Sequence, residues 1–283
     1  MKGAEKLAMR EAANCADEVL TALGMETLPV DPFAVATRKD IIVQAADLDS
    51  CSGCLTVVGS AYGILYARGL GNEGFERFTV SHELGHFFLP GHPTALFANG
   101  RTIHQSHSGF VSADPIERQA DYFAGALLMP ERLFRGALRA QQAVGFGTVQ
   151  ALAAMCRTSI TATAIRFALY ADDPVAVIVS KGQTVEYCFM SDAITTRRGL
   201  SWLRKGSPVP RRTVTADFNR TASNITGAVE KEGTSMLSDW FDGAPDTEMN
   251  EDVVGLGRYD RTLTVLFTDE ALDEEGEETG DDE

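Results

Sequence analysis

The sequence has no apolar run long enough to cross a membrane. Within its 283 residues, no stretch approaches the roughly eighteen apolar residues of a membrane-spanning helix. Residues 1–6 also lack the charged segment and the apolar segment of a secretory signal peptide. We therefore expect a cytoplasmic protein without a membrane partner.

Cysteine is scarce and odd in number, which argues against a framework of disulfides in a reducing compartment. The chain contains only Cys15, Cys51, Cys54, Cys156 and Cys188. Cys51 and Cys54 form a single C-x-x-C pair, with no second pair to complete a zinc ribbon and no evident βαβ context for a thioredoxin-like site. A structural pair and a redox sensor are the two interpretations, and we predict the structural one.

Basic residues are missing from the last fifteen residues, 269–283, which hold ten acids. Without these ten acids the formal net charge of −15 becomes −5, so the rest of the chain is only mildly acidic. A segment of this composition cannot bury enough apolar surface to fold. We expect residues 269–283 to be a disordered acidic tail that aids solubility.

Histidine is also rare, yet two of the five histidines stand four residues apart in Ser81-His82-Glu83-Leu84-Gly85-His86. On an α-helix, residues four apart lie on one face, so His82 and His86 can bind one ion while Glu83 reaches a metal-bound water. The motif predicts the active helix of a zinc peptidase. We expect the preceding residues, 78–80, to form a strand-like run.

A catalytic zinc needs three protein ligands and one open position, so this helix lacks one ligand. Asp114-Pro115 predicts the start of a later helix, which Met129-Pro130 ends. Glu117 and Asp121 share one face of it, and we predict that Glu117 binds the metal while Asp121 accepts a hydrogen bond from a ligand histidine. The alternative is a capping box of Glu117 with Asp114, and a solvated Asp121.

His92 competes with Glu117, because it stands at the third-ligand position of the metzincin pattern H-E-x-x-H-x-x-G-x-x-H. That pattern has a glycine where this chain has Leu89, although Pro90-Gly91 can supply a later turn. We therefore predict Glu117 as the ligand. His104 and His107 fall in a predicted loop, residues 100–110, where they could flank a cleft, and we assign them no firm role.

The combined motifs resemble the ImmA/IrrE family of gluzincin-like metallopeptidases. The resemblance is carried by residues 77–86 (RFTVSHELGH), 117–124 (ERQADYFA) and 127–130 (LLMP), and it extends over residues 4–170. It implies a zinc-dependent endopeptidase, with Mn²⁺ as the alternative metal, that cleaves a helix-turn-helix transcriptional repressor and so derepresses stress-response or mobile-element genes. It also implies His82, His86 and Glu117 as metal ligands and Glu83 as general base.

The expected mechanism follows from this chemistry. Zinc lowers the pKa of its water toward about 7, Glu83 takes the proton, and the hydroxide attacks a peptide carbonyl. Glu83 then protonates the leaving amine. The rival hypothesis is a non-enzymatic transcriptional regulator that keeps the peptidase fold and binds a partner or DNA, and the intact ligand set argues against it.

The pattern of the whole chain predicts an α+β fold. Helices are expected at 4–23 and 32–38, and strands at 41–43, 54–58 and 61–66, within a zincin-like peptidase domain at 1–140. Strands at 175–180, 184–190 and 262–267 indicate a C-terminal α+β domain at 173–268. Longer members of the family that the chain resembles carry a GAF-like domain there, so that fold is expected by analogy only.

Between the two domains, residues 141–172 resemble a helix-turn-helix, with helices at 148–156 and 160–170. Arg166 is the only basic residue of the second helix, whereas phosphate binding needs clustered Lys and Arg. We therefore favour packing or repressor docking over DNA binding. A basic stretch around Trp202, from Arg197 and Arg198 to Arg211 and Arg212, is interpreted as a solvated loop rather than a nucleic-acid contact.

Overall fold

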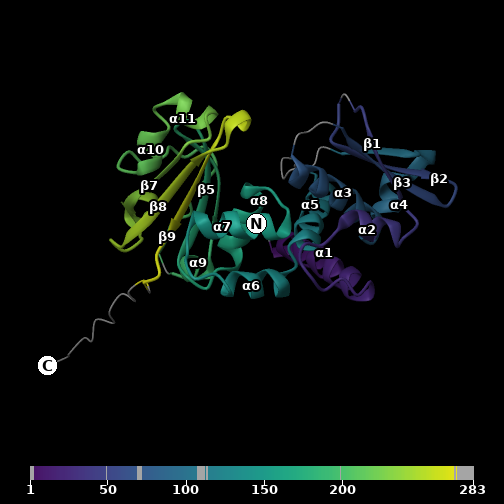
Figure 1. The fold of residues 1–283 in the computed structure, drawn as a ribbon, viewed down its shortest axis with the longest axis horizontal. Coiled ribbons are helices and arrows are strands. Elements are labelled where there is room, and N and C mark those ends of the chain that lie inside the picture. The colour runs from purple at the N-terminus through teal and green to yellow at the C-terminus, as the bar shows by residue number, and fades with distance from the viewer. Residues whose placement is uncertain are drawn as a thin grey trace. The chain divides into compact units, whose positions relative to one another are not determined.

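The computed structural model describes residues 3–48, 50–68, 72–106, 112, 114–197, 199–270 and 272. His107, Arg198 and most of the predicted acidic tail lie outside the described residues. The described chain mixes helices with two separate sheets, which confirms the α+β class (Figure 1). No helix in this part of the chain combines the length and the apolar character that a membrane crossing requires.

The chain divides into two compact units, residues 1–139 with 150–163 and residues 140–149 with 164–283. The division runs through the two helices of the predicted helix-turn-helix segment. Both helices form where the sequence indicates, as α7 (Phe146–Cys156) and α8 (Ile160–Tyr170). The domain limits that we expect at 140, 172 and 268 stay predictions.

The first unit contains a four-stranded sheet in the order β1-β3-β2-β4, in which only the β1–β3 pair is parallel. Its strands are β1 (Ile42–Ala46), β2 (Gly53–Val58), β3 (Ala61–Ala67) and β4 (Ile103–Ser106). Its helices are α1 (Gly3–Ala22), α2 (Pro32–Thr37), α3 (Glu73–Phe88), α4 (His92–Leu96), α5 (Pro115–Leu128) and α6 (Glu131–Arg139), with a 3₁₀ turn at Ala98–Gly100. One face of the sheet packs on α3.

Local signals explain where several of these helices begin and end. The Asp31 side chain accepts a hydrogen bond from Phe33 N at 3.0 Å and so caps α2, as predicted. After α1, Gly24 adopts a left-handed conformation with φ of 61°, which a glycine does at little cost. The predicted helices at 4–23 and 32–38 and the predicted strands of this unit are therefore confirmed to within a few residues.

The strand-like run predicted at 78–80 is wrong, because these residues lie inside α3. The helix begins at Glu73, where the side chain of Asn72 accepts a hydrogen bond from Phe75 N at 3.2 Å. Phe78, Thr79 and Val80 are all buried within it. Aromatic and β-branched residues favour strands only weakly, and burial of a helix on nearly every side overrides that preference.

The predicted loop at 100–110 is also wrong in part, since residues 103–106 form β4. This strand pairs with β2, so that His104 lies opposite Leu55 and Ser106 opposite Gly53. Opposed residues of an antiparallel pair share one face of the sheet. His104 and Ser106 therefore face α3, on the same side as Gly53. A strand of four residues carries too little alternation to be recognised from sequence.

The second unit is an antiparallel five-stranded sheet in the order β6-β5-β9-β8-β7 (Figure 1). Its strands are β5 (Val175–Lys181), β6 (Thr184–Met190), β7 (Glu230–Met236), β8 (Glu248–Gly255) and β9 (Thr262–Phe267). Its short helices are α9 (Asp192–Thr195), α10 (Val214–Phe218), α11 (Ala222–Thr226) and α12 (Leu237–Trp240), with a 3₁₀ turn at Gly257–Tyr259. The three predicted strands are confirmed, and β7 and β8 were not predicted.

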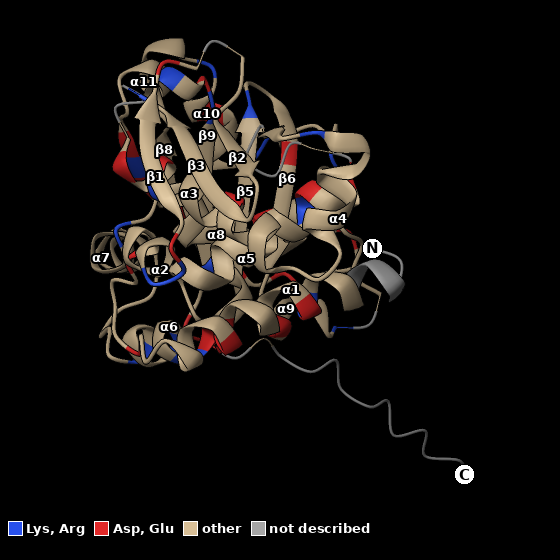
Figure 2. Ribbon diagram, turned by 90° about the vertical axis from the view of Figure 1, so that its right-hand side faces the viewer, with Lys and Arg blue, Asp and Glu red and all other residues tan. Residues whose placement is uncertain are grey.

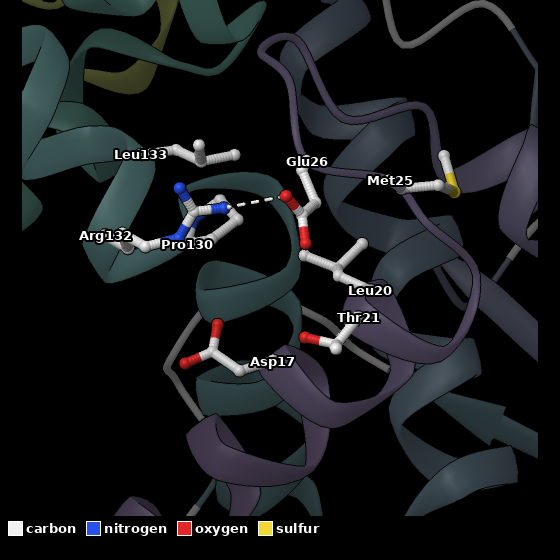
Figure 3. A pocket seen from close by; sticks show the side chains of 8 residues that line it. All are labelled: Asp17, Leu20, Thr21, Met25, Glu26, Pro130, Arg132 and Leu133. Carbon is white, nitrogen blue, oxygen red and sulfur yellow. Dashed lines mark ion pairs between the residues drawn. The ribbon is translucent and has the colours of Figure 1, made fainter.

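One pocket of the first unit lies between the end of α1 and the start of α6 (Figure 3). It is lined by Asp17, Leu20, Thr21, Met25, Glu26, Pro130, Arg132 and Leu133. The Arg132 guanidinium and the Glu26 carboxylate form an ion pair of 3.5 Å at its edge. Both side chains are exposed, so this pair contributes little stability. No residue of the predicted metal site lines this pocket, and we assign it no chemistry.

The close approach of α3 and α5 depends on small residues. A Cβ atom added to Gly85 would lie 3.1 Å from the Ala120 Cα atom and 3.1 Å from Phe123. Because the first of these neighbours is backbone, it cannot move aside without shifting α5. Gly85 and Ala120 therefore set the distance at which the two helices pack, and with it the separation of the side chains that they carry.

We expect Gly85→Val to lower the free energy of unfolding by about 1–3 kcal/mol, because the new side chain overpacks the α3–α5 contact. Denaturant unfolding measures the change. The matched control is Gly136→Val in α6, where an added Cβ meets nothing within 4 Å. This control should stay within about 0.5 kcal/mol of the original protein. Equal effects of the two substitutions would contradict the packing argument.

Candidate metal centre

Helix α3 carries three polar side chains into the interior of the first unit. His82, Glu83 and His86 are each 0% exposed. One helical turn separates the two histidines, and their Nε2 atoms lie 3.1 Å apart. The sequence motif is therefore a buried cluster rather than a solvated helix face.

Helix α5 adds a carboxylate to the same point. One oxygen of Glu117, Oε2, lies 3.2 Å from His82 Nε2, and the other, Oε1, lies 3.3 Å from His86 Nε2. One ligand atom from each of these three residues lies within 4.8 Å of the others. The structure thus brings together the three side chains that the sequence predicts as metal ligands.

The capping-box alternative for Glu117 is not formed. Asp114 caps α5 by accepting a hydrogen bond from Ile116 N at 2.9 Å, while its own N–H donates to Ser112 Oγ at 3.1 Å. The side chain of Glu117 faces the histidines instead. Glu117, which the sequence predicts as a metal ligand, therefore lies with its side chain at the two histidines.

Asp121 stands one turn after Glu117 and is not a surface acid, since it is only 1% exposed. Its Oδ1 atom lies 2.8 Å from His82 Nδ1, on the side of the ring that faces away from the cluster. A carboxylate in this position accepts the Nδ1–H of a histidine and leaves Nε2 free for a metal. The structure gives Asp121 the contact that its predicted role requires.

His92, the competing ligand, lies on the far side of His86. Its Nδ1 atom is 3.1 Å from His86 Nδ1, and its Nε2 atom is 3.0 Å from Gln119 Oε1. Both nitrogens are therefore engaged away from the ligand atoms of the cluster. The contact with Gln119 was not predicted, because no spacing rule relates residues 27 positions apart.

His104 joins the cluster from β4, and the sequence assigned it no firm role. Its Nε2 atom lies 2.9 Å from Glu117 Oε1, and its side chain is 19% exposed. It is therefore the site histidine nearest to solvent, whereas the rings of His82 and His86 are fully buried. The contact of His104 with Glu117 could not be predicted from the sequence, because it depends on the place of His104 in a strand that faces α3.

The electrostatics of His82 and Glu117 are set by their mutual contacts. Burial alone would lower the pKa of His82, but hydrogen bonds with Asp121 and Glu117 outweigh it and raise the pKa to about 10. Burial alone would raise the pKa of Glu117, but hydrogen bonds with His104, His82 and His86 hold it well below its usual range. Glu117 is therefore an ionised carboxylate, as a metal ligand must be.

Burial dominates the other two groups of α3. It lowers the pKa of His86 to about 3, against the opposing hydrogen bond with Glu117. It raises the pKa of Glu83 to about 7, against the charge of His82 and the nearby Ser106 hydroxyl, which lies outside hydrogen-bond geometry. A carboxylate whose pKa lies near neutrality suits a general base, because such a group accepts and returns a proton at working pH.

Both carboxylate oxygens of Glu83 are buried and have no hydrogen-bond partner among the described residues. The same holds for Ser106 Oγ, whose hydroxyl lies on the β4 face toward α3. Buried polar atoms are nearly always paired, so such atoms indicate that a partner outside the chain belongs there. A donor set of two imidazoles and one carboxylate with an open position matches catalytic zinc sites, and these residues fit a metal ion with water.

Gly53 of β2 provides the space beside Glu83. A Cβ atom on this glycine would lie 2.7 Å from Glu83 Oε1 and 2.6 Å from Thr79 Cγ2. A larger residue would therefore displace the carboxylate from its position.

The glycine lies between the two cysteines of the C-x-x-C pair, whose sulfur atoms are 3.4 Å apart. Burial, then the hydrogen bond with Cys51, raises the pKa of Cys54 to about 12, which disfavours a reactive thiolate.

The helix-turn-helix segment shows little basic character. Helix α7 has no Lys or Arg, and the only base of α8 is Arg166, so both are drawn mostly tan in Figure 2. The Arg166 guanidinium donates to the Tyr170 hydroxyl at 2.6 Å and lies 5.1 Å from the centre of that ring. Helices with so few cations offer a duplex few phosphate contacts. Whether the segment contacts nucleic acid stays a prediction.

Comparisons with known proteins point to one family of metallopeptidases. Residues 64–167 match the Peptidase_M78 family, described as an IrrE N-terminal-like domain. The chain is 30% identical over 177 residues to the radiation response metalloprotease IrrE of Deinococcus radiodurans, covering 56% of this chain and 50% of that protein. The chain thus spans about half the length of this curated relative. These matches confirm the resemblance to the family and the zincin-like fold of the peptidase domain.

A solved structure, described as a Mycobacterium tuberculosis transcriptional regulator, shares the fold more widely. It superposes with a TM-score of 0.57, at 16% identity, over 91% of this chain and 76% of that chain. At this identity the likeness concerns the fold alone. It extends beyond the segment that the family model covers.

We expect Glu117→Ala to weaken zinc binding by more than about 100-fold, because it removes one of three ligands and the only carboxylate among them. Competition with a chromophoric chelator measures the affinity. The matched control is Glu131→Ala, which removes an exposed acid that pairs with Arg135 on α6. Unchanged zinc affinity in Glu117→Ala would remove this residue from the metal site.

Proposed function

We propose that this chain, whose residues 64–167 match the family described as an IrrE N-terminal-like domain, is a zinc-dependent endopeptidase that cleaves a helix-turn-helix transcriptional repressor. Cleavage would derepress stress-response or mobile-element genes, and we propose the cytoplasm as the place of the reaction. The observation that carries the proposal is the unpaired Glu83 carboxylate beside the His82–His86–Glu117 cluster.

In this proposal His82, His86 and Glu117 hold the metal. When bound, zinc acts as a Lewis acid that polarises a peptide carbonyl and acidifies water. Glu83 takes the proton of the attacking water and returns it to the leaving amine. The two unpaired oxygens of Glu83 leave it free to accept this proton, and its pKa of about 7 matches both steps.

The edge of the sheet offers a place for the substrate backbone. Strand β4 pairs with β2 on one side and ends the order β1-β3-β2-β4. An extended peptide can add to such an edge through backbone hydrogen bonds. Since His104 of β4 contacts Glu117, a peptide on this edge would lie next to the cluster. An extended segment of a repressor, rather than an intact helix, would therefore be cut.

Glu83→Gln is expected to lower the rate of peptide cleavage by a factor of about 10²–10⁴, because the amide cannot accept the proton of the attacking water. The zinc content of the purified variant should stay unchanged, because Glu83 is not a ligand. Cleavage is followed by mass spectrometry of the products. Glu76→Gln on the same helix serves as control. Full activity of Glu83→Gln would exclude the proposed base.

The substrate proposal needs a test of its own. We expect the zinc-loaded protein to cut a helix-turn-helix repressor encoded next to its gene at one defined peptide bond, and the chelator-treated protein to leave it intact until zinc or manganese is restored. Gel electrophoresis and mass spectrometry identify the cut. A metal-free protein that still relieves repression in cells would instead favour the non-enzymatic regulator.

A further inference from the structure

The imidazole ring of His86 is held from both sides. Its Nε2 atom faces His82 Nε2 at 3.1 Å and Glu117 Oε1 at 3.3 Å, which is the side of the ligand cluster. Its Nδ1 atom faces His92 Nδ1 at 3.1 Å. The ring of His92 is itself buried. Its other nitrogen, Nε2, lies 3.0 Å from Gln119 Oε1.

This row of contacts restricts where hydrogen atoms can lie. Burial disfavours a charged ring, and a neutral imidazole has one N–H donor and one acceptor nitrogen. If Gln119 Oε1 accepts from His92 Nε2–H, the Nδ1 atom of His92 is left as an acceptor. The hydrogen in the contact between the two rings then belongs to His86 Nδ1, and His86 Nε2 is left with a lone pair toward the cluster.

The opposite direction has a different consequence. A side-chain amide can be turned so that its nitrogen donates to His92 Nε2. Each hydrogen then shifts by one position, and His86 carries its hydrogen on Nε2, where it blocks metal binding. Only the first direction, with the Gln119 oxygen as acceptor, makes His86 a ligand, so the two directions are chemically distinguishable.

The backbone delivers His92 to this point through a tight turn. Helix α3 ends at Phe88, and Gly91 adopts a left-handed conformation with φ of 84° before α4 begins at His92. The His92 N–H donates to the Leu89 carbonyl at 3.2 Å. The later turn at Pro90-Gly91 therefore brings His92 back to the ring of His86, but on the side away from the ligand atoms.

We propose that His92 and Gln119 are positioning residues that hold His86 as the Nδ1–H tautomer, with Nε2 directed at the metal. They do for His86 what Asp121 does for His82, through a neutral relay in place of a carboxylate. The identity of the ion rests on the proposed function. The relay is measured in the metal-bound chain, because without the metal the Glu117 carboxylate, 3.3 Å from His86 Nε2, accepts a hydrogen from that atom.

The first experiment measures the tautomer directly. Long-range ¹⁵N–¹H correlation spectra of the zinc-loaded, ¹⁵N-labelled protein distinguish a protonated Nδ1 from a protonated Nε2, and His92→Phe identifies the signals. We expect the His92 ring to be neutral with its hydrogen on Nε2, and the His86 ring to carry its hydrogen on Nδ1. A hydrogen on His92 Nδ1 would overturn the proposal.

The second experiment measures metal affinity in the full-length chain. His92→Phe keeps a buried aromatic ring but removes the acceptor, and we expect zinc affinity to fall about 10–100-fold. His92→Asn can place its Oδ1 atom where His92 Nδ1 stands, so it should recover most of the affinity. Gln119→Leu should lower affinity, while Gln119→Glu, which keeps an acceptor oxygen, should not.

These outcomes separate the relay from mere packing. If His92→Phe keeps the affinity, or if His92→Asn recovers none of it while both variants melt like the original protein, the relay is wrong. The visible spectrum of bound Co²⁺ gives a second readout, which should change with His92→Phe and return with His92→Asn. If the original protein binds no zinc, the proposed function fails; if it binds zinc but His92 carries its hydrogen on Nδ1, only the relay fails.

Discussion

The packing of α3 against α5 is the constraint on which the site depends. Neither helix carries a complete metal site, because α3 supplies two imidazoles and α5 supplies the carboxylate. Gly85 and Ala120 let their backbones approach until ligand atoms of three side chains lie within 4.8 Å. The same contact places Asp121 behind His82. A change in the separation of the helices would therefore alter the ligands and their support together.

The buried polar groups of this contact hold one another in place. His82 is oriented by Asp121, Glu117 is contacted by His104, and His86 is contacted by His92. Burying polar groups costs free energy unless each finds a partner, so a network of this kind is stable only when nearly complete. Its members come from α3, α4, α5 and β4, which makes the site a product of the whole first unit rather than of one motif.

The sequence predicted the part of this network that helical spacing controls. His82 with His86 and Glu117 with Asp121 are four-residue pairs, and such pairs share a helix face whatever the rest of the fold does. The contact of His104 with the cluster was not predicted, because it depends on a four-residue edge strand. The contact of His92 with His86 was not predicted, because it depends on a turn. The sequence also predicts a strand at residues 78–80, because the burial of α3 on all sides is a tertiary property that local composition does not reveal.

Both carboxylate oxygens of Glu83 are buried without a hydrogen-bond partner among the described residues, unlike the carboxylates of Glu117 and Asp121, and this difference has a physical reason. A carboxylate that accepted hydrogen bonds from the chain would have a lower pKa and would compete poorly for the proton of water. Leaving it unpaired costs about 1–3 kcal/mol of stability. The tight packing of α3 offsets that cost, and Gly53 leaves the space beside the carboxylate oxygen free of a side chain. The fold thus tolerates an unsatisfied carboxylate at the position where a reacting molecule would satisfy it.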